Sequence, residues 1–232
     1  MSNKQRILSI VLITITVILF VYYLGPSERI WGAGEEPYMV IAGKKPADAN
    51  ISVRVNYFGR GESCSGWSWN AGSGKVNTGI YNESFKLEHN FSADENFYEL
   101  RIPYQPRQPE RGCITYLSNM EVKLINAFDT VGFANLRIYR AGTDYDNKPI
   151  GLTSIIEAKK CEPFYSAKYN RWTNGFGCFY YVNGEKKSKD QEFNAESVYF
   201  DFSQFNSDTV IHYDILAGEN YRTVPLDPET GK

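Results

Sequence analysis

One pair of residues in this sequence could carry out acid–base chemistry: His212 and Asp214 in the segment TVIHYDIL. Two residues that are two apart on a β-strand point to the same face, so the pair would resemble part of a hydrolase triad. A triad also requires a nucleophile on a strained turn and an oxyanion hole, and the sequence contains no G-x-S-x-G motif. His89 is the only other histidine. We therefore predict that the chain has no catalytic residues.

A phosphate-binding loop is the first reading of the tetrapeptide GSGK at Gly72–Lys75. Such a loop follows the pattern G-x-x-x-x-G-K-[ST], in which backbone N–H groups surround the phosphates and the hydroxyl holds magnesium. Trp69 stands where the first glycine should be, and Val76 replaces the Ser or Thr. We interpret WNAGSGKVNTG as a flexible, surface-exposed loop and predict no nucleotide or other cofactor.

Asp144, Asp146 and Asn147 in AGTDYDNKPIG resemble the start of a calcium-binding loop. An EF-hand loop needs a glycine at its sixth position and a glutamate at its twelfth. Pro149 and Ile155 occupy those positions, so the EF-hand pattern fails. A turn with local Asx hydrogen bonds is the favoured interpretation, and a lone calcium ion bridging two loops is the alternative. No metal site is predicted.

Four cysteines are present, Cys64, Cys113, Cys161 and Cys178, and none lies in a C-x-x-C motif. With only two histidines in the chain, a zinc site is disfavoured. An even number of cysteines in an exported chain indicates disulfides, and four cysteines allow three pairings. We favour Cys161–Cys178, which closes a short aromatic loop, together with Cys64–Cys113.

Aromatic residues gather beside both pairs of cysteines. Trp67 and Trp69 follow Cys64 in ESCSGWSWNAG, and Trp, Tyr and Arg dominate the binding energy of protein interfaces. A loop tethered by a disulfide is also pre-organised, which lowers the cost of ordering it on binding. The alternative is that these rings pack on the sheet as core. The segment between Cys161 and Cys178 adds the other candidate partner-binding residues, Phe164, Tyr165, Tyr169, Arg171 and Trp172.

A membrane anchor is predicted at Ile7–Leu24, which has 18 residues without charge, glycine or proline. As a helix it would be about 27 Å long, close to the ~30 Å hydrocarbon core of a bilayer. Lys4 and Arg6 precede it, and the basic flank stays in the cytoplasm. The body is then expected in the periplasm, held at the inner membrane. A cleaved signal peptide is the alternative, although the run is long for one and no A-x-A site follows it.

The remaining chain is predicted to be mainly β. Aromatic residues make up 15% of the chain, which favours sheets, and a net charge of −2 argues against nucleic acid as a partner. One short helix is expected over Ile150–Lys160. Alternating or β-rich runs predict strands that would form an antiparallel sandwich or barrel. These runs are Ile51–Phe58, Ser84–His89, Phe97–Tyr104, Met120–Ala127, Val131–Tyr139, Phe176–Val182, Ser197–Phe202 and Thr209–Leu216.

The predicted organisation has four parts. Residues 1–6 form a cytoplasmic tip, 7–24 the transmembrane signal anchor, 25–50 a juxtamembrane spacer and 51–232 the exported β-rich domain. Gly, Pro, Ala and charged residues dominate the spacer, which is typical of a linker, although Tyr38–Ala42 could form a short strand. One domain is favoured over two because residues 51–225 show no break in composition.

The layout resembles that of membrane-anchored periplasmic immunity proteins, which neutralise type VI secretion effectors, including lipase effectors. The segments that carry the resemblance are NYFGRGESCSGW, AFDTVGFANLRIYRAG, EFNAESVYFDF and DTVIHYDILAGENYR. The resemblance assigns no functional residue. It implies a protein that binds and occludes a toxin without catalysis of its own. The alternatives are a structural or assembly component of the envelope or of a secretion machine, and an envelope hydrolase.

Overall fold

The computed structural model describes residues 30–225, except for 65, 71, 111, 143–146 and 194. The predicted cytoplasmic tip and the anchor at Ile7–Leu24 lie outside the described residues. Within the described part of the chain, no helix is long and apolar enough to cross a membrane. The described residues form sixteen strands and one short 3₁₀ helix, η1 (Phe202–Gln204).

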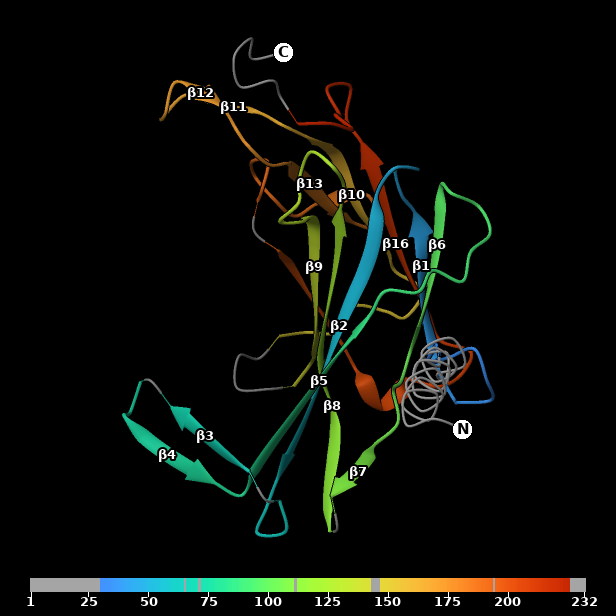
Figure 1. Cartoon of the computed structure of the whole chain (residues 1–232), viewed down its shortest axis with the longest axis vertical. Coiled ribbons are helices and arrows are strands. Elements are labelled where there is room, and N and C mark those ends of the chain that lie inside the picture. Colours follow the sequence, from blue (N-terminus) through green and yellow to red (C-terminus); the bar gives the residue numbers. More distant parts are fainter. Residues whose placement is uncertain are drawn as a thin grey trace, which may run out of the picture.

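Two large sheets form the body (Figure 1). In strand order, sheet A contains β14 (Glu185–Lys186), β13 (Gly177–Val182), β10 (Ile155–Glu162), β16 (Val210–Ala217), β1 (Met39–Lys44) and β6 (Phe97–Ile102). Sheet B contains β15 (Glu196–Phe200), β9 (Phe133–Arg140), β8 (Cys113–Ile125), β2 (Asn50–Arg60) and β5 (Ile80–Leu87), and β7 (Arg107–Glu110) pairs with β8. Two small hairpins stand apart, β3 (Trp67–Asn70) with β4 (Lys75–Thr78) and β11 (Tyr165–Ser166) with β12 (Arg171–Trp172).

The hydrophobic core lies between the two sheets. Strands bury alternate residues, as the period of two requires. In sheet B, β2 directs Val53, Val55 and Tyr57 inward, and in sheet A, β16 directs Ile211 and Ile215 to the same core. The prediction of a mainly β, sandwich-like domain is confirmed.

The sheets are mixed, which corrects the prediction that the strands pair only in antiparallel fashion. β16 lies between β1 and β10 and is parallel to both, and β15 is parallel to β9. The other strand pairs in the two sheets are antiparallel. Alternation along a strand shows which side chains face the core, but it holds no information on the direction of the neighbouring strand.

The helix predicted over Ile150–Lys160 is wrong, because most of this segment belongs to strand β10. Ile156 and Ala158 are buried at a spacing of two, and β10 is hydrogen-bonded to β13 on one side and to β16 on the other. The segment is short enough to fit either periodicity. Pairing with β13 and β16, which are distant in sequence, makes the segment a strand, and this tertiary context overrides its local helix propensity.

The folded domain begins before residue 51. The strand expected at Tyr38–Ala42 is present as β1, and it lies between β16 and β6 inside sheet A. Arg101 on β6 contacts the residues that precede β1. Its guanidinium donates a 2.7 Å hydrogen bond to the carbonyl of Gly32 and lies 4.6 Å from the ring centroid of Tyr38. Part of the predicted spacer is therefore built into the sandwich.

Candidate protein-binding surfaces

Both predicted disulfides are present, Cys64–Cys113 and Cys161–Cys178, and within the described residues no cysteine is free. Each disulfide lies at the base of a hairpin. Cys64 precedes β3 and joins the first residue of β8, whereas the second disulfide joins β10 to β13, the strands that flank β11 and β12. The cross-links thus fix the two points from which the hairpins extend.

The β3–β4 hairpin replaces the flexible loop that was predicted for WNAGSGKVNTG. Trp69 pairs with Val76 and Trp67 with Thr78, and residues paired in this way share a face. Trp67 is 71% exposed and Trp69 66% exposed. Gly72–Lys75 forms the turn and the first residue of β4, so no helix follows it, as a phosphate-binding loop would require. The hairpin presents an exposed apolar strip.

The β11–β12 hairpin presents the second set of predicted residues. Tyr165 pairs with Trp172 across the two strands, with ring centroids 6.0 Å apart in a T-shaped arrangement. Trp172 and Tyr169 are exposed. Arg171 is exposed as well, and its guanidinium carbon lies 5.9 Å from the ring centroid of Tyr169. Aromatic rings and a guanidinium are thus brought together on a two-stranded projection.

Phe164 differs from its neighbours on this loop because it is half-buried. Its ring packs against Phe193, with the centroids 4.8 Å apart, and lies over Gly177, where a Cβ atom would come within 2.7 Å of the ring. The backbone N–H of Phe164 donates to the hydroxyl of Thr173 at 3.0 Å. This residue therefore supports the base of the hairpin.

A buried carboxylate also holds this base in place. Oδ2 of Asp129, in the loop between β8 and β9, accepts a 2.9 Å hydrogen bond from the N–H of Phe176. Oδ1 accepts one from the N–H of Gly132 at 3.0 Å. The ring of Phe176 is stacked on Phe128 at 4.9 Å. The chain that returns from β12 is thus attached to sheet B by both polar and apolar contacts.

The two hairpins lie at opposite ends of the long axis of the molecule and extend to the same side (Figure 1). Between Trp67 in the first hairpin and Trp172 in the second, the chain contributes several strands to the body. The structure therefore does not bring the two sequence-predicted clusters together into one patch. It displays them as two separate projections.

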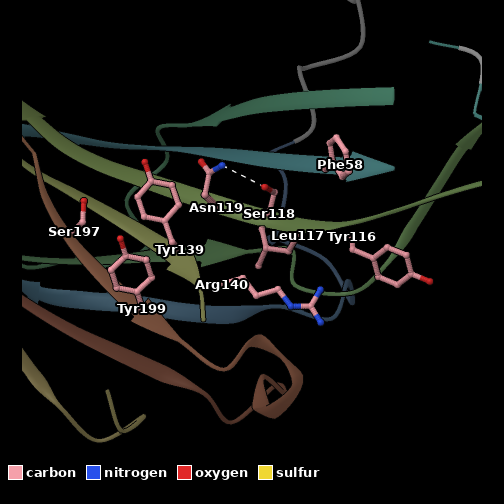
Figure 2. Close-up of a pocket in the computed structure, with 9 residues that line it drawn as sticks. All are labelled: Phe58, Tyr116, Leu117, Ser118, Asn119, Tyr139, Arg140, Ser197 and Tyr199. Carbon is pink, nitrogen blue, oxygen red and sulfur yellow. Dashed lines mark hydrogen bonds between the residues drawn. The ribbon is translucent and has the colours of Figure 1, made fainter. Parts of the chain in front are cut away.

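A third surface, which sequence reasoning missed, is a groove of about 630 Å³ on sheet B. Aromatic rings line it at both ends, and Ser118, Asn119, Ser197 and Arg140 supply polar groups (Figure 2). The available signal was a set of three aromatic residues in three predicted strands, whereas Tyr116 lies in the part of β8 that precedes the predicted strand Met120–Ala127. Those positions become neighbours only through the register of the sheet. The rings are Phe58, Tyr116, Tyr139 and Tyr199.

His212 and Asp214 lie on β16 and line a depression of about 600 Å³ on the outside of sheet A. Oδ1 of Asp214 accepts a 2.8 Å hydrogen bond from the backbone N–H of Lys44. The carboxylate therefore binds the end of the neighbouring strand β1. Among the described residues that line the depression there is no serine or cysteine, and the hydroxyl groups there are those of Thr153 and Thr209.

The candidate calcium ligands Asp144 and Asp146 lie outside the described residues. Among the residues described, no group of three or more His, Cys, Asp or Glu side chains is placed to hold a metal ion. Comparison with protein-family models, with curated proteins and with solved structures gives no match.

Proposed function

We propose that this chain is an exported binding protein that holds another protein through its two disulfide-based hairpins. One observation supports this most directly: each disulfide lies at the base of a hairpin that exposes tryptophan. Exposed apolar patches on soluble domains mark interaction sites, and Trp, Tyr and Arg are the residues enriched in binding hot spots. A cross-linked base reduces the conformational entropy that such a projection loses on binding.

The class of partner follows from the resemblance in layout. A periplasmic immunity protein acts by covering a toxin, which requires a rigid surface and no catalytic group. We therefore propose that the partner is a secreted antibacterial effector. Two projections that extend to the same side (Figure 1) would allow the chain to grip such a partner at two separate points.

The location belongs to the same proposal. Structural disulfides form and persist in oxidising compartments, and the apolar run Ile7–Leu24 would hold the domain at the inner membrane with its body in the periplasm. An effector delivered to the periplasm would then meet its binding protein there.

The experiment measures protection and affinity together. The genes that neighbour this chain's gene are searched for a toxin, and that toxin is expressed in bacteria with the full chain or with the double variant Trp67→Ala/Trp69→Ala. We expect the wild type to restore growth and the variant to fail, with affinity weakened about 30-fold or more, as expected for hot-spot loss of ~2 kcal/mol.

Phe97→Ala is the control, because Phe97 is an exposed aromatic residue on β6, away from both hairpins. It should protect like the wild type. Full protection by the double variant, or a gene neighbourhood without an effector that binds the chain, would contradict the proposal.

A further inference from the structure

We propose that the groove on sheet B is a second contact surface, which binds an acidic, extended segment of the protein partner with Arg140 as its anchor. The inference rests on the proposed function in one respect, namely that the partner is a protein. It concerns residues that neither hairpin contains.

The register of sheet B places cationic side chains in one row on the outer face of the sheet, beside the groove. Arg54 is paired with Lys86 on β5 and with Glu121 on β8, and Glu121 is paired with Arg137 on β9. Lys86, Arg54 and Arg137 are exposed. The row thus holds three positive charges against one negative charge, in a chain whose net charge is −2. Lys86 is also in an ion pair with Glu88, which follows it on the chain.

The adjacent row is uncharged and contributes Asn119, Tyr139 and Tyr199 to the groove. Asn56 is paired with Asn119, Asn119 with Tyr139, and Tyr139 with Tyr199. Nδ2 of Asn56 donates a 2.7 Å hydrogen bond to Oδ1 of Asn119. The rings of Tyr139 and Tyr199 are stacked, with centroids 5.8 Å apart. Amide and hydroxyl groups of this kind can pair with a peptide backbone, and the rings can pack against apolar side chains.

Figure 2 shows how Arg140 completes the groove. The two stacked tyrosines lie at one end and Phe58 and Tyr116 at the other, and the Arg140 side chain extends between them. Tyr116 is 50% exposed, so its ring is available to a ligand. The groove therefore combines aromatic walls with one guanidinium.

Among the described residues, neither Arg140 nor Arg54 forms an ion pair. Arg140 does act on one carboxylate from a distance: the pKa of Asp201, which is lowered mainly by hydrogen bonds from Ser203, is lowered further by the charge of Arg140. By contrast, Arg137 lies 3.4 Å from Glu121. A guanidinium that is not held in a close ion pair, set beside aromatic rings, can bind a carboxylate in a bidentate manner. Charge complementarity thus indicates an acidic ligand.

The dimensions indicate a short peptide. The groove crosses from β2 to β15, which is three inter-strand gaps, or about 14 Å at ~4.8 Å per gap. An extended chain rises ~3.3 Å per residue, so about four residues would fill it. A segment with a carboxylate at Arg140 and apolar side chains between the rings meets all of these conditions. The recessed shape favours such a segment over the flat surface of a bilayer.

The test is a selection of random 12-residue displayed peptides on the full chain in detergent. We expect the enriched sequences to be acidic with interspersed apolar residues. A synthetic copy of the leading peptide should bind Arg140→Gln or Tyr116→Ser at least tenfold more weakly than the wild type. Its affinity should also fall as salt is raised. Melting temperatures of both variants, measured in parallel, show that they fold.

Lys123→Gln is the matched control, because it removes a cation from the same sheet outside the groove and should change the affinity less than twofold. Neutral or basic selected peptides, or equal binding by Arg140→Gln, would overturn the proposal. So would Arg140-dependent binding to phosphatidylglycerol vesicles without peptide binding. The variant Trp67→Ala/Trp69→Ala should keep its peptide affinity, so failure of the hairpin proposal can be told apart from failure of this one.

Discussion

The hydroxyl of Tyr213 on β16 donates a 2.7 Å hydrogen bond to the carbonyl of Ala134 on β9, and this bond joins sheet A to sheet B through the core. Ala134 has a left-handed φ of 50° and lies where the register between β8 and β9 shifts. The carbonyl of Tyr213 in turn accepts a 2.6 Å hydrogen bond from the hydroxyl of Tyr98 on β6. Buried polar groups of the two sheets thus satisfy one another.

The variant Tyr213→Phe should destabilise the domain by about 1–3 kcal/mol, because the buried carbonyl of Ala134 loses its partner. Urea unfolding under non-reducing conditions measures the change. Tyr116→Phe is the control, since that ring is half exposed and its hydroxyl can be solvated. Equal stability of Tyr213→Phe and the wild type would show that the inter-sheet bond does not contribute.

Alkaline pH should destabilise the domain. Burial raises the pKa of Tyr98, Tyr180 and Tyr213 above the usual value of 10.0, so the folded state keeps protons that the unfolded state loses. Stability is therefore fully present below pH ~10 and is lost as pH rises through the folded pKa values, by up to ~1.4 kcal/mol per pH unit for each tyrosine. Burial also raises the pKa values of Tyr57 and Tyr221. The lowered pKa of Lys45, caused by burial, acts in the opposite direction, but it is one group against five.

Urea unfolding at a series of pH values from 8 to about 11 checks this prediction. The fall above pH ~10 should be less steep in Tyr213→Phe, which lacks one of the titrating groups. Stability that stays constant or rises over this range would contradict it.

Two aromatic residues of the loop closed by Cys161–Cys178 should behave in opposite ways. Trp172 is 53% exposed, whereas Phe176 is 1% exposed and packs against Phe133 with centroids 4.8 Å apart. Phe176→Ala should cost about 3–5 kcal/mol of stability through the cavity it leaves. Trp172→Ala should cost less than about 1 kcal/mol and weaken partner binding by at least ~2 kcal/mol.

Thermal unfolding and partner affinity, measured on both variants, separate the two roles. A large drop in the melting temperature of Trp172→Ala with unchanged affinity would make the hairpin a structural element and remove it from the binding surface.

The two disulfides should contribute unequally to stability. The chain-entropy model predicts a larger effect for a longer loop, and the sequence separations are 49 for Cys64–Cys113 and 17 for Cys161–Cys178. Double Cys→Ser variants should lose about 4 and about 3 kcal/mol respectively. Denaturant unfolding gives both values, and non-reducing peptide mapping confirms the pairing. Four free thiols in the exported protein would contradict the prediction.

The topology has a direct test in fusions at the C-terminus. Alkaline phosphatase requires an oxidising compartment for its disulfides, so a phosphatase fusion to the full chain should be active. Replacing Val11, Ile15 and Ile18 with charged residues should abolish that activity, because the run could then no longer cross a bilayer. An inactive phosphatase fusion combined with a fluorescent cytoplasmic reporter would contradict the periplasmic location.

Several features follow from the sequence alone because they depend on neighbours along the chain. The alternation in Ile51–Phe58 and Thr209–Leu216 predicted strands that the structure contains as β2 and β16. Cysteine spacing and the aromatic residues around it led to both disulfides. Trp67 and Trp172 are candidates from the sequence because the first follows Cys64 and the second lies in the aromatic loop between Cys161 and Cys178. Periodicity and short loops depend only on residues that are close in sequence, so a single segment is enough to reveal them.

Other features were decided only by the tertiary structure. Ile155 to Lys160 became a strand because β13 and β16 pair with it, and a segment of that length fits either period. β16 inserted in parallel between β1 and β10, which no local pattern specifies. The groove is the clearest case, since Phe58, Tyr116, Tyr139 and Tyr199 come from four strands. A shift of one residue in any of those strands would turn its ring to the opposite face of the sheet. Long-range register, set by the packing of the whole core, is what brings these rings together.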